Sequence, residues 1–131
     1  MRTQRGFSLI EILAALAILA IVITTTLAMF VDRQKHLREA SEQTLAYQAL
    51  ANEAEIWRRI GFTALPSENA PEEFRSSTTI LNPLKPFTTT VAVKNTRSDL
   101  KEVTLTIAWN KGGRTAKLAL IRTDTGASNL W

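Results

Sequence analysis

The hydrophobic pattern of the chain begins with an uncharged run of 20 residues, from Ile12 to Val31. An α-helix rises about 1.5 Å per residue, so a helix of this length covers roughly the 30 Å thickness of the hydrocarbon core of a bilayer. Glu11 directly precedes the run and Asp32 directly follows it. The run therefore predicts a membrane-spanning helix with a charged residue at each end.

Beyond Val31 the chain becomes charged, but apolar residues continue to recur at helical spacing, and neither glycine nor proline occurs between Phe7 and Gly61. The recurring residues are Leu37, Leu45, Tyr47, Leu50, Ala54, Trp57 and Ile60. The pattern predicts a single helix from Phe7 to Ile60, about 80 Å long, whose second half is amphipathic. The residues expected to contact a core are Tyr47, Leu50, Ala54 and Trp57.

A connecting loop follows the predicted helix over residues 62–86. It holds all four prolines of the chain, Pro66, Pro71, Pro83 and Pro86. Prolines at this density mark turns and loops. Within the loop, the segment from Ser77 to Leu81 is predicted as a short edge strand.

After the loop, apolar and polar residues alternate with the period of a β-strand in three successive runs. The residues on the apolar side are Phe87, Thr89, Val91 and Val93, then Val103, Leu105, Ile107 and Trp109, then Ala116, Leu118 and Leu120. The predicted turns are 95–99 and 110–113. The fold class expected is α+β, with a long N-terminal α-helix packed on a small three- to four-stranded antiparallel sheet.

Composition excludes several kinds of chemistry. The chain has no cysteine, so it contains neither disulfides nor thiolate metal sites. Its one histidine, His36, is surrounded in sequence by Lys35, Arg33 and Arg38, where a metal ion would be repelled, and it is interpreted as an ordinary surface residue. No combination of residues predicts a catalytic site, so we expect no enzyme activity, no metal and no cofactor.

The net charge of +4 is concentrated in the C-terminal half, where residues 85–122 hold eight basic and two acidic side chains. Such an asymmetry raises the hypothesis of DNA binding. However, Arg97 and Lys111 lie in predicted turns, and Trp109, the aromatic ring near Lys111, is expected in the core, so the stacking surfaces typical of single-strand binding are missing. A nucleic-acid partner is therefore not expected.

At the other end, Arg2 and Arg5 precede the apolar run, which favours a cytoplasmic N-terminus. A secretory signal peptide fits poorly, because its apolar region is typically about 7–15 residues and ends at a small-residue cleavage site. A simple membrane anchor fits better, but it leaves Glu11 unexplained. Carboxylates at membrane depth are costly and suggest a function and a partner.

The residues Arg5-Gly6-Phe7-Ser8-Leu9-Ile10-Glu11, followed by the 20-residue apolar run, resemble the class III signal of type IV pilins and pseudopilins. The resemblance covers closely only about the first 30 residues. It implies that prepilin peptidase cleaves between Gly6 and Phe7, that Phe7 is then N-methylated, and that Glu11 pairs with the Phe7 amine of a neighbouring subunit and sets the register of assembly.

The resemblance also implies a domain organisation. It consists of a leader peptide (1–6), a transmembrane and assembly half of the helix (7–31), an amphipathic half (32–61), the connecting loop (62–86) and a β-meander that completes the globular domain (87–131). The expected location is the inner membrane, crossed once with the C-terminal domain in the periplasm, and later the fibre. The expected partners are other pilin or pseudopilin subunits, prepilin peptidase, the inner-membrane assembly platform and membrane lipid.

A looser resemblance concerns the rest of the chain. The segment 48–65 and the meander ending in Ile107-Ala108-Trp109 are similar to minor pilins of the PilV type and to the minor pseudopilin I of type II secretion. This implies a minor subunit of a pilus or pseudopilus, at the tip or in initiation. A main fibre subunit and a DNA-uptake or adhesion module displayed on the fibre are the alternatives.

Overall fold

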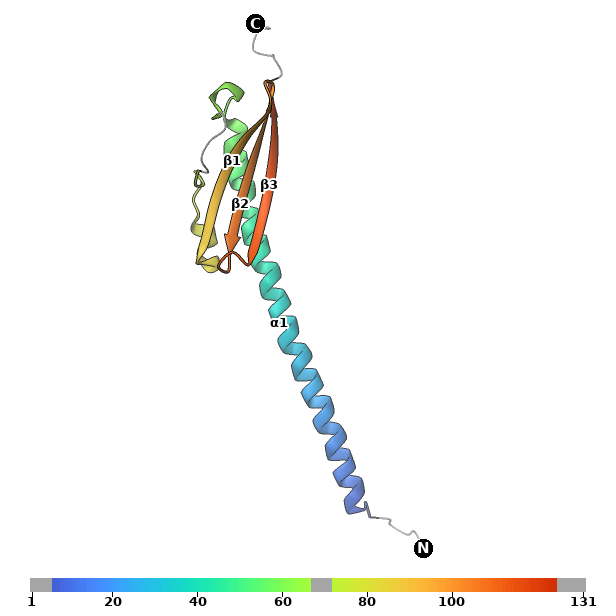
Figure 1. Ribbon diagram of the computed structural model, residues 1–131. Coiled ribbons are helices and arrows are strands. Elements are labelled where there is room, and N and C mark those ends of the chain that lie inside the picture. The colour runs from blue at the N-terminus through green and yellow to red at the C-terminus, as the bar shows by residue number, and fades with distance from the viewer. Residues whose placement is uncertain (1–5, 67–71, 125–131) are drawn as a thin grey trace. The chain divides into compact units, whose positions relative to one another are not determined.

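The computed structural model describes residues 6–66 and 72–124 and divides the chain into two compact units, Met1–Ala40 and Ser41–Trp131. The predicted leader residues 1–5 and Pro71 of the connecting loop lie outside the described residues. The long helix α1 runs from Leu9 to Arg59, close to the predicted bounds (Figure 1). Arg58 and Arg59 occupy its last turn, where positive charge interacts favourably with the helix dipole.

The first part of α1 is apolar and uncovered. Its most apolar 18-residue window has a mean hydropathy of 2.6 and is not buried by any other part of the described chain. Large side chains such as Leu13, Ile18 and Phe30 are each more than half exposed. By length and composition this part of the helix is able to cross a membrane, where lipid would surround these side chains.

The sheet is a three-stranded antiparallel meander. Strand β1 (Phe87–Arg97) pairs with β2 (Leu100–Trp109), which pairs with β3 (Arg114–Thr123), so the three strands lie side by side in sequence order (Figure 1). The predicted α+β class is confirmed, with three strands. The first turn is tighter than predicted, because β1 continues to Arg97 through a register shift between Asn95 and Arg97.

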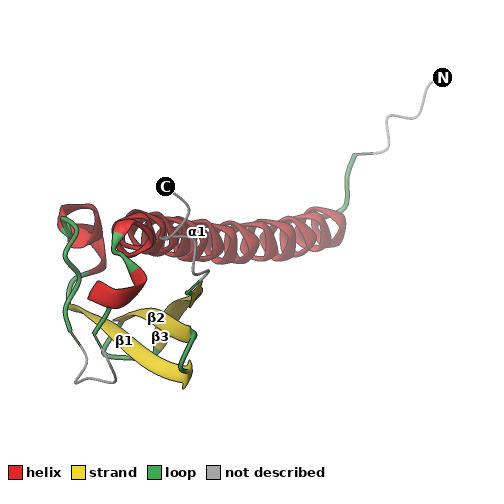
Figure 2. Ribbon diagram, turned by 90° about the horizontal axis from the view of Figure 1, so that it is seen from above, coloured by secondary structure: helices red, strands yellow, loops and turns green. Residues whose placement is uncertain are grey.

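One face of the sheet packs on the C-terminal part of α1 (Figure 2). The predicted alternation is confirmed, since the apolar side of each strand is buried or half-buried and faces the core. In β2 the four predicted core residues, Val103, Leu105, Ile107 and Trp109, are all at most 3% exposed. The helix buries Ala46, Ala49, Leu50, Glu53, Ala54 and Trp57.

The predicted core position of Tyr47 is wrong. Its side chain is 52% exposed, whereas Leu50 and Trp57 are completely buried. The buried residues recur at steps of three and one along the helix, a stripe that includes Glu53 and passes beside Tyr47. The prediction failed because it placed Tyr47 in the core for its aromatic ring and left out Glu53.

The predicted edge strand from Ser77 to Leu81 is also wrong. Thr79–Leu84 is instead a 3₁₀-helix, and a shorter one spans Phe62–Ala64. A 3₁₀-helix has three residues per turn, so Leu81 and Leu84 lie on the same side, and both are buried in the core. The physical reason is the three-residue spacing of these two leucines, because a strand would have placed them on opposite faces.

Candidate processing and assembly site at the start of the helix

Gly6 and Phe7 precede the first residue of α1, and Phe7 is 81% exposed. A Cβ atom added to Gly6 would meet no heavy atom within 4 Å. The described fold therefore does not need glycine at this position. Glycine at this position can instead serve an external partner, because a residue without a Cβ atom lets a protease approach the backbone closely.

Ser8 and Glu11 form a capping box at the helix start. The Ser8 side-chain oxygen accepts the backbone N–H of Glu11 at 3.4 Å, and Glu11 Oε2 accepts the backbone N–H of Ser8 at 3.4 Å. The Ser8 carbonyl also accepts the Glu11 N–H at 3.0 Å. This reciprocal arrangement satisfies donors that have no partner within the helix, and an acidic residue in the first turn complements the helix dipole.

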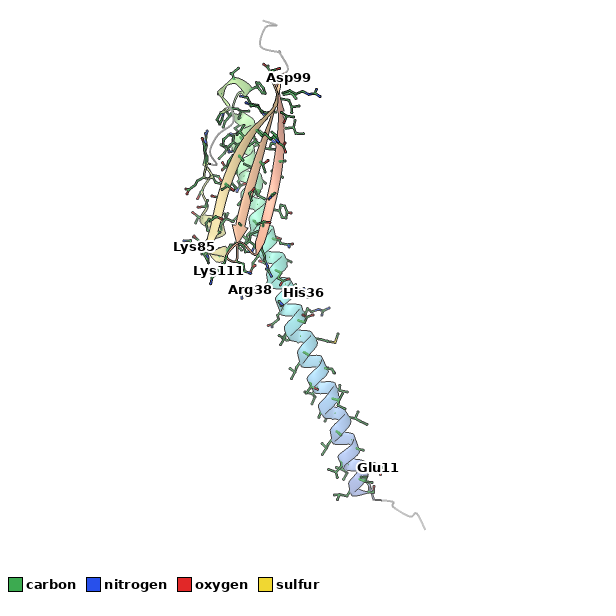
Figure 3. All side chains as sticks on the ribbon, in the orientation of Figure 1. Glu11, His36, Arg38, Lys85, Asp99 and Lys111 are labelled. Carbon is green, nitrogen blue, oxygen red and sulfur yellow. The ribbon has the colours of Figure 1, made fainter. Side chains whose placement is uncertain are left out.

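The capping box fixes where the helix begins. With Ser8 as the cap, Leu9 is the first helical residue, and the bond between Gly6 and Phe7 lies outside the helix. Sequence reasoning missed this function of Glu11, although the spacing Ser-x-x-Glu before an apolar run is its signal. Figure 3 labels Glu11 in this first turn.

An apolar groove of about 360 Å³ adjoins Glu11 on the same part of the helix. Its lining residues are Phe7, Glu11, Ile12, Ala15, Leu16 and Leu19. A single carboxylate among apolar side chains suits a partner that is apolar and carries one positive group.

His36 lies farther along the helix and contacts acidic side chains. Its Nε2 is 3.4 Å from a carboxylate oxygen of Asp32, and its Nδ1 is 3.8 Å from Glu39. The surroundings of His36 are therefore not only basic, because Asp32 and Glu39, four and three positions away, share its helix face. The described ranges contain no cluster of three His, Cys, Asp or Glu residues that could hold a metal ion.

Three of the basic residues of the sheet are engaged within the domain. Lys101 Nζ donates to the carbonyl of Leu65 at 2.8 Å, and Arg122 donates to the carbonyl of Ile60 at 2.8 Å. Arg114 pairs with Glu42 at 2.8 Å. Lys101 and Arg122 thus bind carbonyls near the end of α1 and in the following turn, where such groups lack helical partners.

The outward face of the sheet does not concentrate the remaining charge. Its residues are mostly threonine and alanine, with Lys94, Glu102 and Lys117 as the charged ones among strand positions 88–94, 102–108 and 115–121. Lys85 and Lys111 lie at one end of the sheet and Asp99 at the other (Figure 3). This distribution does not favour the hypothesis of DNA binding, which requires basic groups gathered on one surface.

Glu53 is a second unusual carboxylate, and it is completely buried. Its Oε1 accepts the Trp57 indole N–H at 2.7 Å and the Arg75 backbone N–H at 3.0 Å, and its Oε2 accepts the Ser76 backbone N–H at 2.7 Å. Burial acts to raise the pKa of Glu53, but these hydrogen bonds to the ionised form outweigh it and lower the pKa below its ordinary value of 4.5.

Residues 1–27 match the sequence model of the prokaryotic N-terminal methylation motif. No significant match was found among curated proteins or solved structures. The match includes Gly6, Phe7, the capping box and most of the uncharged run. Together with the long apolar helix on an antiparallel sheet, the motif supports a type IV pilin-like protein that prepilin peptidase processes.

Proposed function

We propose that this chain is a minor pilin or pseudopilin. In this proposal prepilin peptidase cleaves it between Gly6 and Phe7, and its apolar helix then assembles into a pilus or pseudopilus. The observation that carries the proposal is the position of the Gly6–Phe7 bond, directly before a capped apolar helix with Glu11 in its first turn. The small three-stranded domain and the absence of cysteine favour a minor subunit at the tip or in initiation.

Cleavage changes the chemistry around Glu11. It creates an ammonium group at Phe7, four residues before Glu11, next to the apolar groove that both residues line. A buried carboxylate and a buried ammonium each need the other, because either charge alone is costly in an apolar environment. Pairing between Glu11 of one subunit and the Phe7 amine of the next would set the register of neighbouring helices, with N-methylation of Phe7 leaving that amine basic.

Before assembly, the subunit is proposed to cross the inner membrane once. The N-terminus is then cytoplasmic, since Arg2 and Arg5 precede the span, and the sheet domain is periplasmic. The partners are the membrane lipid, the inner-membrane assembly platform and other pilin-like subunits.

The test separates processing from assembly by two substitutions, in a bacterium that assembles type IV pilin-like fibres. Gly6→Ala is expected to block cleavage, detected by mass spectrometry as a retained leader. Glu11→Gln is expected to be cleaved and inserted normally but to be lost from sheared fibres. Glu55→Gln is the matched control, since Glu55 is an exposed carboxylate of the same helix, paired with Arg58 and Arg59. Normal incorporation of Glu11→Gln, or normal cleavage of Gly6→Ala, contradicts the proposal.

A further inference from the structure

The described part of the connecting loop includes a segment, 72–84, that lies against both the sheet and the helix; it is called the strap here. Glu72 makes an isolated antiparallel bridge with Val91 on the free edge of β1. The Glu72 N–H donates to the Val91 carbonyl at 3.0 Å, and the Val91 N–H donates to the Glu72 carbonyl at 2.7 Å. The strap therefore covers the edge of β1 at this position.

The two halves of the strap differ in how deeply their apolar side chains are buried. The second half is anchored by Leu81 and Leu84, which are buried in the hydrophobic core. The first half, 72–77, has no completely buried side chain: Phe74 is half-buried against the core, and the backbone N–H groups of Arg75 and Ser76 both donate to Glu53. Segments held by few buried apolar contacts open at lower free energy than the core. The first half, whose apolar contacts are shallower, is therefore expected to open at lower free energy than the second half.

The surroundings of Glu53 favour its ionised form. Its two oxygens accept hydrogen bonds from three donors, namely the Trp57 indole and the two strap amides. A protonated carboxyl accepts these bonds more weakly, because the assistance of the negative charge is lost, and its O–H becomes a further donor beside those already present. Protonation therefore weakens the contacts between α1 and the strap.

The Arg75 and Glu72 side chains bring charge to this contact. The Arg75 guanidinium lies 4.6 Å above the Trp57 ring and pairs with the Glu72 carboxylate at 3.2 Å. The sheet side of the described core is formed by apolar residues such as Val91, Val103 and Leu105. Glu53 is completely buried on the helix side of this core, and Arg75 contributes the neighbouring positive charge.

We propose that Glu53 is an acid-sensitive latch, whose protonation releases the first half of the strap from α1 and uncovers the edge of β1 at Val91. The latch is closed at neutral pH, because hydrogen bonding to the ionised form lowers the pKa of Glu53 below 4.5. An uncovered strand edge presents unpaired N–H and C=O groups that can pair with another chain. Acidification would therefore change which surface the domain offers to its neighbours.

The experiment measures amide hydrogen exchange on the full chain in detergent micelles, corrected for the intrinsic pH dependence of exchange. The reporters are the amides of Arg75, Ser76 and Val91, each of which donates across the latch or the strap bridge. The reference is the set of β2 amides at 103–107. Acidification of the unsubstituted chain from pH 7 to about 3, below the ordinary Glu range, is expected to lower reporter protection at least tenfold while β2 stays protected.

Glu53→Gln tests the same opening at constant pH. Its NH₂ group is a donor, as in the protonated acid, so at pH 7 it is expected to lower reporter protection by about tenfold or more. Glu55→Gln, an exposed carboxylate two residues away, is expected to change nothing. The proposal is overturned if acid leaves the reporters as protected as at neutral pH, or if the reporters and β2 lose protection together in the unsubstituted chain.

Discussion

Arg114 Nη1 lies 2.8 Å from Glu42 Oε2, and this contact joins the first residue of β3 to the helix 72 positions earlier in the chain. The Trp109 indole N–H donates to the same oxygen at 3.2 Å. The Glu42 and Arg114 side chains are 20% and 30% exposed, so water screens their attraction less than at a fully exposed pair. Glu42 therefore ties two strands to the helix at one end of the domain.

The first prediction concerns this contact. Glu42→Gln removes the charge, and we expect it to lower the free energy of unfolding by about 1 to 2 kcal/mol, the range for hydrogen bonds to charged groups reduced by partial exposure. Urea denaturation of the chain in detergent micelles, followed by tryptophan fluorescence, measures it. Glu55→Gln removes an exposed carboxylate from the same helix and should change the value by less than about 0.5 kcal/mol. Equal effects of the two substitutions would contradict the stabilising role assigned to Glu42.

The second prediction separates two apolar residues of the helix that are three positions apart. Leu50 is completely buried and Tyr47 is 52% exposed. Leu50→Ala should lower the free energy of unfolding by about 2 to 5 kcal/mol, because it removes buried contacts and leaves a cavity. Tyr47→Ala should change it by less than about 0.5 kcal/mol. The same denaturation measurement compares them, and a large loss in Tyr47→Ala would place that ring in the core after all.

The sheet was predictable because its signal is local. Side chains alternate between two faces of a strand, so a period of two in the sequence directly gives the buried side of β2, from Val103 to Trp109. The glycines at 112 and 113 marked the second turn in the same way. Neither inference needed knowledge of distant residues.

The buried face of the helix was less predictable, because its decisive contacts come from far along the chain. Glu53 is buried only because Arg75 and Ser76, 22 and 23 residues later, supply backbone donors. Without those donors a buried carboxylate would be very costly, and a sequence pattern alone favours placing it in water. Counting charges also could not show that Lys101 and Arg122 face inward onto backbone carbonyls.

The candidate site at the helix start was found from its motif. Gly6, Phe7 and Glu11 were named from a resemblance, and the methylation-motif match covers the same residues. Their individual roles remain predictions. The capping function of Glu11 was available from sequence as well, since Ser8 precedes it by three residues.

The third prediction is a pH dependence of stability. The pKa of Glu53 is lowered in the folded chain, so its ionised form stabilises the fold above the ordinary value of 4.5, and this contribution is lost as the pH falls through the folded pKa. Unfolding free energies measured between neutral pH and about pH 3 should therefore decline below pH 4.5. Glu53→Gln should be less stable at neutral pH and show a shallower decline. An identical slope in both chains would assign the acid sensitivity to other carboxylates.

The fourth prediction concerns the turn between β2 and β3. Gly112 has φ of 84°, and Asn110 and Lys111 both have φ of 53°, a region that costs residues with a Cβ atom about 1 to 2 kcal/mol. Gly112→Ala should therefore lower the free energy of unfolding by about 1 kcal/mol, although the new methyl group meets no atom within 4 Å. Lys111→Gly should be neutral or stabilising. Thermal denaturation compares the two, and a stabilising Gly112→Ala would contradict the strain argument.

The last prediction concerns Thr24, Thr25 and Thr26 in the apolar half of α1, which end a run of six β-branched residues. Each hydroxyl donates to a backbone carbonyl three or four residues earlier, at 2.7 to 3.0 Å. Such bonds compete with the helical N–H groups for the same carbonyls and tend to bend or weaken a helix locally. In an assembled fibre, we expect faster amide exchange at 24–26 than at 14–19.

Two sets of substitutions separate the causes of that faster exchange. Replacing the three threonines by valine removes the hydroxyls and keeps the β-branching, whereas replacing them by alanine removes both. If the hydroxyls weaken the helix, valine should restore most of the protection, and if β-branching does so, only alanine should restore it, because alanine has the higher helix propensity. Equal protection of the two regions in the unsubstituted fibre would show that the helix is uniform through this run.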